Sequence, residues 1–476
     1  MTDKSPLTPS EEQSPKKEPF LLGLALAARR GIRGLINGIE RLLRQPRLEW
    51  EHAILEGGSQ AEIEAHALKI AVSNVKHCVE PRPLLNGEEK LVLCAGVRNF
   101  REPWARDFGF ATFGLMALGQ VQVVRDCLEA FLLYQRPSGQ FPVKLHSTRV
   151  LERYMHSLFK REQPIHKPLR PKYQTAHRTI SLDGNSLLVI AALHYVEQTG
   201  DYDFLRTHWE GLCRAMTWLE EHARGDDGLL HQGAFTDWAD SIGRTGRILY
   251  TNVLYWKAVS GLAKASVHCE SDLHQQWWED KAQRLYDNIQ AHFWRDEQGY
   301  FITSEQHHSL SSSGNTLAVA WGLATEEQAH SILDAMKRIG MADPVPTQVV
   351  SYGYRRRDVA VENHIARIPH YHTNAAWLWL GGWHAVALAR TGRPSEAQEL
   401  ITRMSKAIVQ DGVVHEVYGK NGRFLSTLLY TSEAPLTWNA SMVIYAFSVC
   451  KEEMFSFKNR GHLGTQEIDR PVMRES

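Results

Sequence analysis

Six acidic residues stand in polar stretches that separate the apolar, helix-like parts of this chain of 476 residues. Two carboxyl groups that face one another can work as a proton donor and as a base or nucleophile, which is the chemistry of glycosidic bond cleavage. Single residues also have structural explanations, since Asp183 suits a helix N-cap and Asp107 can pair with Arg106. All the candidates stand in the polar stretches between apolar segments, which favours a shared site. The candidates are Asp107, Asp183, Asp237, Asp240, Glu416 and Glu433.

The stretches that carry these residues also hold most of the clustered aromatic and amide side chains. Two of them are preceded by matching sequences, DGLLHQ at 227–232 and DGVVHE at 411–416. This internal similarity predicts equivalent positions that face each other across one cavity. The stretches are NFREPWARDFGF (99–110), TISLDGNS (179–186), FTDWADSIGRTGR (235–247), SLSSSGNT (309–316), IPHYHTNAAW (368–377) and TSEAPLTWNA (431–440).

From residue 60 onward, apolar residues recur with the 3.6-residue period of an α-helix in twelve segments. Tight turns such as Thr199-Gly200 and Thr391-Gly392 join many of them in pairs. The first helix of a pair is apolar all round, as in LLVIAAL at 187–193, whereas its partner at 201–223 is amphipathic. The segments lie near 60–79, 104–118, 120–136, 182–198, 201–224, 248–268, 273–293, 313–323, 325–339, 371–391, 394–410 and 434–452.

A helix that is apolar all round belongs inside a fold, and an amphipathic one belongs outside. Six inner helices that alternate with six outer ones predict an all-α fold, an (α/α)6 barrel over residues 60–455. The long connections join an outer helix to the next inner one, so the polar stretches should gather at one end. The inner helices are expected to begin near 104, 182, 248, 313, 371 and 434.

The two ends of the chain are expected to lie outside the barrel. Residues 1–19 are polar and rich in Pro and Ser, which predicts a disordered tail. The segment 20–59 predicts an amphipathic helix rather than a signal peptide, because acidic residues precede its apolar run and Arg29 and Arg30 follow it. Such a helix can touch a membrane or a partner. Residues 456–476 are expected to be a flexible C-terminal tail.

Composition argues against several classes of protein. Lys plus Arg and Asp plus Glu both number 54, so no basic surface for nucleic acid is expected. The 6 Cys are scattered without Cys-x-x-Cys spacing, which indicates a reducing, cytoplasmic environment and no zinc site. No stretch approaches the roughly 20 apolar residues of a membrane span. The 14 Trp suit both a large helical core and the stacking walls of a sugar site.

Short motifs between roughly residues 90 and 450 resemble those of the six-hairpin glycosidases. Trp-Ala-Asp-Ser at 238–241, before TNVLYWKA at 251–258, is similar to the Trp-Met-Asp-Ala element of the amylo-α-1,6-glucosidase domain of glycogen debranching enzymes. Arg-Asp-Phe at 106–108 resembles an element of the neutral/alkaline invertases. Tyr-His-Thr-Asn at 371–374 and Glu-Val-Tyr-Gly at 416–419 resemble two more, although the second lacks the family's Asp.

The resemblance implies roles for individual residues. It makes Asp240 the general acid and Glu416 the general base, and it has Asp107 and Arg106 bind hydroxyls of the innermost sugar. Asp237 would hold Arg244 or raise the pKa of its neighbour. Further expected substrate contacts are stacking platforms, for which core packing is the alternative, and polar groups, with a helix N-cap as the alternative for Asn315. The platforms are Trp104, Trp238, Trp377 and Trp438, and the polar groups are Asp183, Asp237, Asn315, Tyr371, His372 and Asn374.

These features together predict an exo-acting, inverting glycoside hydrolase that needs no metal and no cofactor. The Asp240 and Glu416 carboxyl groups should then face one another across roughly 6.5–9.5 Å. The expected substrate is a short oligosaccharide or glucoside with an α-glucosidic bond, either an α-1,6 branch stub or a small glucosyl compound. Sucrose, as in the invertases, is the alternative.

Other interpretations come from different classes. Sugar epimerases also use α/α barrels and act through histidines, for which His231, His372 and His415 are candidates. Terpene cyclases share the toroid, but the chain has no Asp-rich DDxxD element, and GDDG at 225–228 is typical of a turn. A sugar-binding protein without activity is a third interpretation. Glu433 is the alternative to Glu416 as the base.

Overall fold

The computed structural model describes residues 53–149, 152, 161–163, 167–269 and 272–464. The chain divides into two units, Met1–Arg47 and Leu48–Ser476, and all described residues belong to the second. The predicted tail at 1–19, most of the predicted helical segment at 20–59 and residues 465–476 lie outside the described part.

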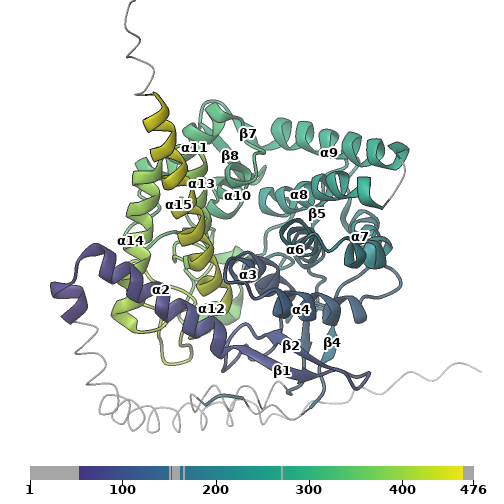
Figure 1. Ribbon diagram of the computed structural model, residues 1–476, viewed down its shortest axis with the longest axis horizontal. Helices are drawn as coiled ribbons and strands as arrows, with labels where there is room; N and C mark the ends of the chain where they lie inside the picture. The colour runs from purple at the N-terminus through teal and green to yellow at the C-terminus, as the bar shows by residue number, and fades with distance from the viewer. Residues whose placement is uncertain (1–52, 150–151, 153–160, 164–166, 270–271, 465–476) are drawn as a thin grey trace, which may run out of the picture. The chain divides into compact units, whose positions relative to one another are not determined.

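Six helices of the described chain form an inner ring in which each helix contacts the next and the last contacts the first (Figure 1). Glycines allow the ring to close tightly. A Cβ on Gly114 would lie 2.1 Å from the Ser441 carbonyl oxygen, and a Cβ on Gly382 would lie 2.7 Å from the Met442 carbonyl oxygen. The ring consists of α3 (Ala105–Ala117), α6 (Asp183–Thr199), α8 (Leu249–Ala265), α10 (Ser312–Ala320), α13 (Leu378–Arg390) and α15 (Thr437–Gly464).

The outer helices are amphipathic and cover this ring. In α11, for example, Ala329, Ile332, Leu333 and Met336 recur at helical spacing and are buried. The first outer helix, α2, packs beside α14 and α15 and so completes the outer layer. The arrangement confirms the predicted (α/α)6 barrel. The outer helices are α2 (Gln60–His77), α4 (Val121–Leu133), α7 (Tyr202–Ala223), α9 (Asp272–Phe293), α11 (Glu326–Ile339) and α14 (Pro394–Asp411).

Short turns join inner to outer helices at one end of the barrel. The turn between α6 and α7 shows their chemistry: Gly200 adopts φ 70°, which ends α6, and the Asp201 side chain then accepts from the Phe204 backbone N–H to cap α7. None of the helices in the described part is long and apolar enough to cross a membrane.

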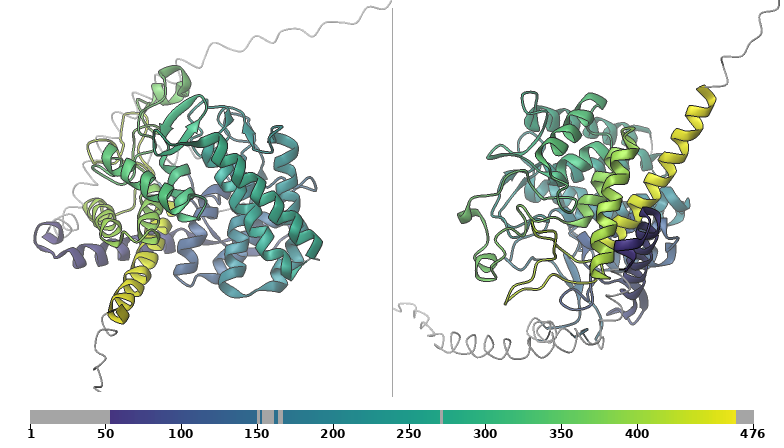
Figure 2. Two further views of the ribbon diagram at one scale, coloured as in Figure 1. Left: turned by 90° about the horizontal axis from the view of Figure 1, so that it is seen from above. Right: turned by 90° about the vertical axis from the view of Figure 1, so that its left-hand side faces the viewer.

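The long connections lie at the other end, and they carry short antiparallel strands that the sequence did not predict (Figure 2). Strands of two to five residues are too short to produce a recognisable alternation. In the longest pair, Val79 of β1 pairs with Leu93 of β2 and Pro83 pairs with Glu89. The pairs are β1 (Val79–Pro83) with β2 (Glu89–Leu93), β3 (Lys144–His146) with β4 (Arg170–Lys172), β5 (His231–Gln232) with β6 (Gly246–Arg247), and β8 (Tyr300–Ser304) between β7 (Trp294–Arg295) and β9 (His307–Leu310).

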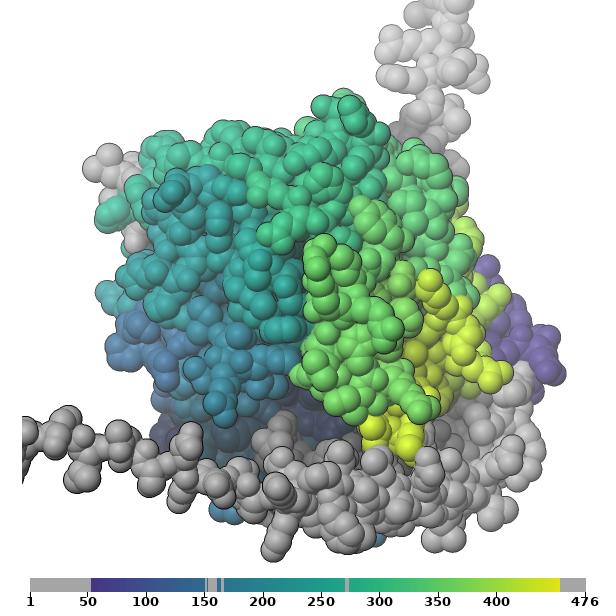
Figure 3. Space-filling view, turned by 180° about the vertical axis from the view of Figure 1, so that it is seen from behind, coloured from purple at the N-terminus to yellow at the C-terminus, as the bar shows by residue number. Residues whose placement is uncertain are grey.

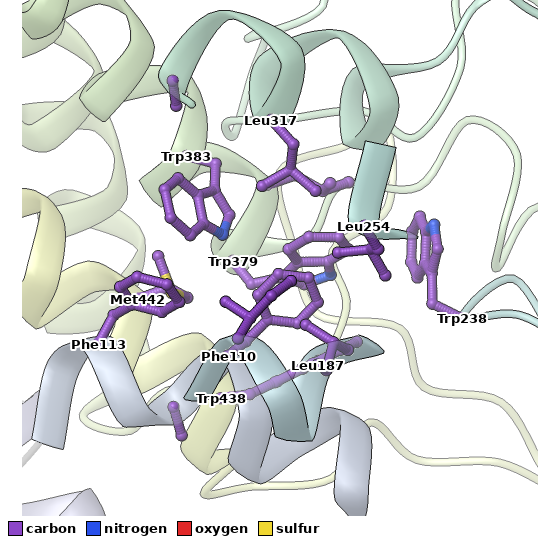
Figure 4. Close-up of a cluster of buried hydrophobic side chains, with 14 of the residues drawn as sticks. Phe110, Phe113, Leu187, Trp238, Leu254, Leu317, Trp379, Trp383, Trp438 and Met442 are labelled. Carbon is purple, nitrogen blue, oxygen red and sulfur yellow. The ribbon is translucent and has the colours of Figure 1, made fainter. Parts of the chain in front are cut away.

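Aromatic rings fill the barrel between the inner helices (Figure 4). Trp379 lies at their centre, with ring centroids 4.8 Å from Phe110, 4.9 Å from Trp238 and 5.0 Å from Trp438. Such edge-to-face and tilted contacts are favourable for aromatic side chains. The barrel is therefore a packed core whose aromatic layer forms the floor beneath the long loops.

A buried asparagine near the start of four inner helices ties each helix to an earlier segment. In α10, the Asn315 side chain accepts from the Phe301 backbone N–H at 3.0 Å and donates to the carbonyl oxygens of Phe301 and Ser311 at 2.8 and 2.9 Å. Asn315 was predicted as a substrate contact, but it is fully buried and its amide is already bonded. The equivalent residues are Asn185, Asn252 and Asn439.

We expect Asn315→Ala to lower the stability of the barrel by about 2–4 kcal/mol, because it leaves the Phe301 N–H and carbonyl buried without partners. Thermal melting should show a fall of roughly 5 °C or more. Asn86→Ala is the matched control, since Asn86 is exposed in the β1–β2 hairpin and accepts a single hydrogen bond from the Glu88 backbone. Equal melting temperatures for the two variants would contradict the structural role.

Candidate active site

Asp237 and Asp240 stand in the loop between β5 and β6, and the structure gives them different environments. The Asp237 carboxylate is 1% exposed and accepts from Arg244 Nε and Nη2, both at 2.9 Å. Gln232 Nε2 and the Ala239 backbone N–H also donate to it, at 2.7 and 2.8 Å. Asp237 therefore holds the loop together and has no free oxygen for a ligand.

Asp240, by contrast, has a side chain that is 43% exposed. Its Oδ2 lies 3.7 Å from Arg106 Nη1. Loss of solvent around the carboxyl group raises its pKa to about 6, against the lowering effect of Arg106 and His177 and with a smaller raising effect from Asp183 and Asp237. A carboxyl group with this pKa can hold a proton near neutral pH, which a general acid requires.

Arg106, on the first turn of α3, is fixed by Asp183 on the first turn of α6. Arg106 Nε donates to Asp183 Oδ2 at 2.6 Å and Nη2 donates to Oδ1 at 3.3 Å. The hydroxyls of Ser181 and Tyr250 also donate to this carboxylate, at 2.6 and 3.3 Å. Asp183 is fully buried, so the predicted substrate contact is replaced by an anchoring contact to Arg106. The N-cap alternative does not hold either, because Leu182 occupies that position.

Asp107 lies within electrostatic range of both predicted catalytic carboxyl groups. Burial raises its pKa to about 7; Arg106 lowers that pKa, while the nearby Glu416 and Asp240 raise it. In the described part of the chain no other side chain donates a hydrogen bond to it. The carboxyl group accepts from the backbone N–H of Asp107 itself. A half-buried carboxylate has more than one acceptor site, so it can also accept from a ligand's hydroxyl groups.

Glu416 follows α14 and points into a cage of hydrogen-bond donors. Tyr371 OH donates to Oε1, while Tyr430 OH and the Glu433 backbone N–H donate to Oε2 at 2.6 and 3.1 Å. Glu416 is 3% exposed, and burial raises its pKa while the three hydrogen bonds lower it. Asn439 Nδ2 also donates to the Glu416 carbonyl oxygen at 2.8 Å, so both its backbone and its side chain are held.

Glu433, the alternative base, is bonded to a different segment. Its carboxylate accepts from the backbone N–H groups of Arg98 and Asn99 at 2.8 and 3.1 Å, and Arg98 Nε lies 3.6 Å away. Glu433 is 1% exposed. Its carboxylate fastens the loop before α3 to the loop before α15, which leaves Glu416 as the better candidate.

His372 lies beside Asp240 but does not form an ion pair with it. Its Nδ1 is 4.0 Å from Asp240 Oδ1 and 2.8 Å from Ser241 Oγ. Burial, with Arg106 and Arg244 nearby, holds the pKa of His372 well below its ordinary value, so the ring is neutral. The other two histidines considered for an epimerase lie elsewhere: His231 contacts Asp227, and His415 stacks on Phe424 at 3.9 Å.

Three of the four predicted stacking platforms belong to the aromatic floor. Trp238, Trp377 and Trp438 are 1%, 3% and 4% exposed, because neighbouring aromatic rings cover them, so core packing is their role. Trp104 differs, since it is partly exposed and Lys144 Nζ lies 4.4 Å from its ring centroid. Trp104 is thus the remaining candidate among the four for stacking on a sugar.

The remaining predicted residues lie on the connection before α13. Tyr371 is in the cage around Glu416, whereas Asn374 accepts from Thr373 Oγ1 at 3.4 Å and lines a separate hollow of about 320 Å³ with Tyr354 and His370. Reasoning from the sequence missed Tyr430, Ser181 and His177. Tyr430 directly precedes one of the singled-out stretches, which is the signal that was available.

Comparisons with known proteins agree with this architecture. A family model described as the bacterial alpha-L-rhamnosidase 6 hairpin glycosidase domain matches residues 110–342. A rhamnosidase from Klebsiella oxytoca with rhamnose bound is 14% identical, with a TM-score of 0.59 over 83% of this chain and 64% of that chain. A GH63 mannosylglycerate hydrolase from Thermus thermophilus, in complex with Tris, is 12% identical, with a TM-score of 0.59 over 79% of this chain and 99% of that one.

A GH78 family rhamnosidase of Bacillus sp. GL1 is 15% identical, with a TM-score of 0.56 over 80% of this chain and 34% of its own length. This chain thus spans 64% and 34% of the two rhamnosidases. At these identities the solved structures show a shared fold. No curated protein sequence matches the chain. The family model covers Asp183, Asp237 and Asp240 and ends before Glu416.

Asp237→Ala and Asp240→Asn should separate the structural from the chemical carboxylate. The first leaves the Arg244 guanidinium, 7% exposed, without its paired acceptor, and should cost about 3–5 kcal/mol of stability. The second changes a half-exposed side chain and should cost less than about 1 kcal/mol. Thermal melting of both variants checks this. A larger loss in Asp240→Asn would reverse the assignment.

Proposed function

We propose that the chain is a glycoside hydrolase of the six-hairpin superfamily and that it removes a terminal sugar from a short glycoside with inversion of configuration. Asp240 is the general acid and Glu416 the general base. One observation carries the proposal: Asp240 and Glu416 both raise the pKa of Asp107, so the three carboxyl groups belong to one site. Of these, Asp240 is half-exposed with a pKa of about 6, and Glu416 is buried among hydrogen-bond donors. They come from loops far apart in sequence, and Asp107 stands within electrostatic range of both.

The reaction follows from these environments. Asp240 gives its proton to the glycosidic oxygen as the bond from that oxygen to the anomeric carbon breaks. Glu416 takes a proton from a water molecule whose oxygen forms the new bond to the anomeric carbon from the opposite face. Arg106, fixed by Asp183, orients Asp240 and limits the rise of its pKa. Asp107 accepts from hydroxyl groups of the bound sugar.

An α-glucoside is the first choice of substrate, because the motifs around Asp240 and Glu416 resemble those of the amylo-α-1,6-glucosidases. An α-L-rhamnoside is the second candidate, because the rhamnosidase family model covers the acid loop. Neither the comparisons with known proteins nor the positions of the three candidate histidines favour sucrose hydrolysis or sugar epimerisation. The six Cys are scattered without Cys-x-x-Cys spacing, which supports a reducing compartment such as the cytoplasm.

The test is sugar release from isomaltose, maltose, trehalose, sucrose, glucosylglycerate and an α-L-rhamnoside, with NMR of the first-formed anomer. We expect one glucoside to be cleaved and to give the β-anomer first. Asp240→Asn should lose about 10²–10⁴-fold of the activity, and much less on α-glucosyl fluoride, whose leaving group needs little protonation. Glu416→Gln should lose activity on both substrates, because both need the attacking water.

Two results would contradict this proposal. Retention of configuration would make one carboxylate a nucleophile rather than a base. Full activity in Asp240→Asn, together with loss of activity in a folded Asp237→Asn variant, would exchange the roles of these two residues.

The activity should also depend on pH in a direction set by Asp240. Because the acid must be protonated, kcat/KM should fall as pH rises through about 6, the pKa to which Asp240 is raised. The measurement is a pH profile on the natural substrate. Asp240→Asn acting on α-glucosyl fluoride is the control and should lose this alkaline limb. If the limb persists there, Asp107, whose pKa is about 7, controls it instead.

A further inference from the structure

The leaving group of the substrate has to lie beside Asp240, because this residue protonates the oxygen that departs with it. Arg106 and His372 lie on the buried sides of Asp240, at 3.7 and 4.0 Å. A further neighbour is His177, which also acts on the Asp240 carboxyl group electrostatically. His177 belongs to the connection between β4 and α6, so it approaches Asp240 from a different segment of the mouth.

His177 is held in place from two directions. Its ring stacks on Phe235 in the acid loop, with centroids 4.4 Å apart and an interplanar angle of 23°. Its Nε2 lies 3.4 Å from Glu362 Oε1, on the short helix α12 (Val361–Ile365). The His177 side chain remains 25% exposed and that of Glu362 remains 63% exposed. The His177 ring, supported by Phe235, thus lies within electrostatic range of Asp240, and the Glu362 carboxylate lies beside that ring. Both side chains remain accessible to a ligand.

The backbone around this contact is strained. Arg178 and Phe235 adopt φ values of 60° and 61°, in the left-handed region that bulky residues rarely occupy. The Thr179 hydroxyl donates to the Phe235 carbonyl oxygen at 2.9 Å and so couples the two segments. Residues held in such conformations cluster at functional sites, where the surrounding structure enforces them.

The segment that carries Glu362 is bonded directly to the acid loop. The Gly243 N–H donates to the Asp358 carbonyl at 2.7 Å, and the Ala360 N–H donates to the Ser241 carbonyl at 2.8 Å. In the space-filling view the segment near residues 350–370, drawn in green, projects beside the teal and yellow-green loops of the same face (Figure 3). The position of Glu362 relative to Asp240 is therefore set by backbone hydrogen bonds.

We propose that His177 and Glu362, with Phe235 behind the histidine ring, form the subsite for the leaving group and select a sugar or small polyol. A hydroxyl-bearing leaving group matches the imidazole and the carboxylate as hydrogen-bond partners, and the free face of the ring can pack against its carbon atoms. The assignment rests on the proposed hydrolase function and adds to it the residues that choose the leaving group.

The test compares His177→Ala and Glu362→Gln with the wild-type enzyme on the best disaccharide of the panel and on the glycosyl fluoride of the same sugar. The pH is kept below the alkaline limb, so that Asp240 stays protonated in every variant. We expect each variant to lose about tenfold or more of kcat/KM on the disaccharide, the size of a lost hydrogen bond. On the fluoride, which has no leaving-group hydroxyls, the loss should stay below about twofold. His308→Ala is the matched control, since His308 is an exposed histidine bonded to the Glu305 carbonyl in the β8–β9 hairpin.

The fluoride also reports on folding, because a variant that cleaves it normally is folded and keeps an intact sugar site and general base. Equal losses on both substrates would overturn the subsite, because the fluoride has no leaving-group hydroxyls, and would place His177 in the structural support of the whole catalytic centre. A shift of the alkaline limb in His177→Ala, with normal cleavage of the disaccharide below that limb, would overturn it too and place His177 in the support of Asp240. Unchanged cleavage of the disaccharide by His177→Ala would overturn it as well. Failure of the hydrolase proposal looks different, since the wild-type enzyme would then release no sugar from either substrate.

Discussion

The side-chain amide of a buried asparagine, bonded to the backbone of an earlier segment, holds the mouth of the barrel in place. The inner helices are packed on all sides by apolar groups. A polar side chain in the first turn of such a helix can still reach the loop that precedes it. Asn252 donates to and accepts from Leu230, directly before the strand that opens the acid loop. Asn439 holds the segment of the proposed base by donating to the carbonyl groups of His415 and Glu416. Since an unpaired buried amide or carbonyl is costly, these bonds fix the loops to the ring.

The buried ion pair of Arg106 with Asp183 extends this constraint to the chemistry. It joins the first turns of two neighbouring inner helices and is surrounded by hydroxyl donors, which compensates for the removal of both charges from water. The pair also affects Asp240, because the Arg106 guanidinium 3.7 Å away lowers the pKa that loss of solvent raises. The proton affinity of the proposed acid is thus set by a contact between helices.

The two proposed catalytic carboxyl groups each have a neighbouring carboxylate with a structural role. Asp237, three residues from Asp240, is saturated by Arg244 and Gln232. Glu433 is saturated by the backbone of residues 98 and 99, and its own N–H supports Glu416. In both pairs the carboxylate with several N–H donors stabilises a loop. The other member either keeps solvent contact, as Asp240 does, or is held by two tyrosine hydroxyls and one backbone N–H, as Glu416 is.

The amino-acid sequence was enough to predict the barrel and the end at which its polar loops gather. The 3.6-residue period, the contrast between all-apolar and amphipathic helices and the glycine turns are local properties that can be recognised without knowledge of the partners. The sequence also narrowed the chemistry to a few carboxylates. Which of these carboxylates are free depends on tertiary contacts, because the saturating partners of Glu433 stand more than 300 residues away in the chain. The same holds for Asn315 and Trp238, whose types suit a sugar site equally well. Only the backbone and rings packed around them show that the first bonds a strand and the second fills the floor.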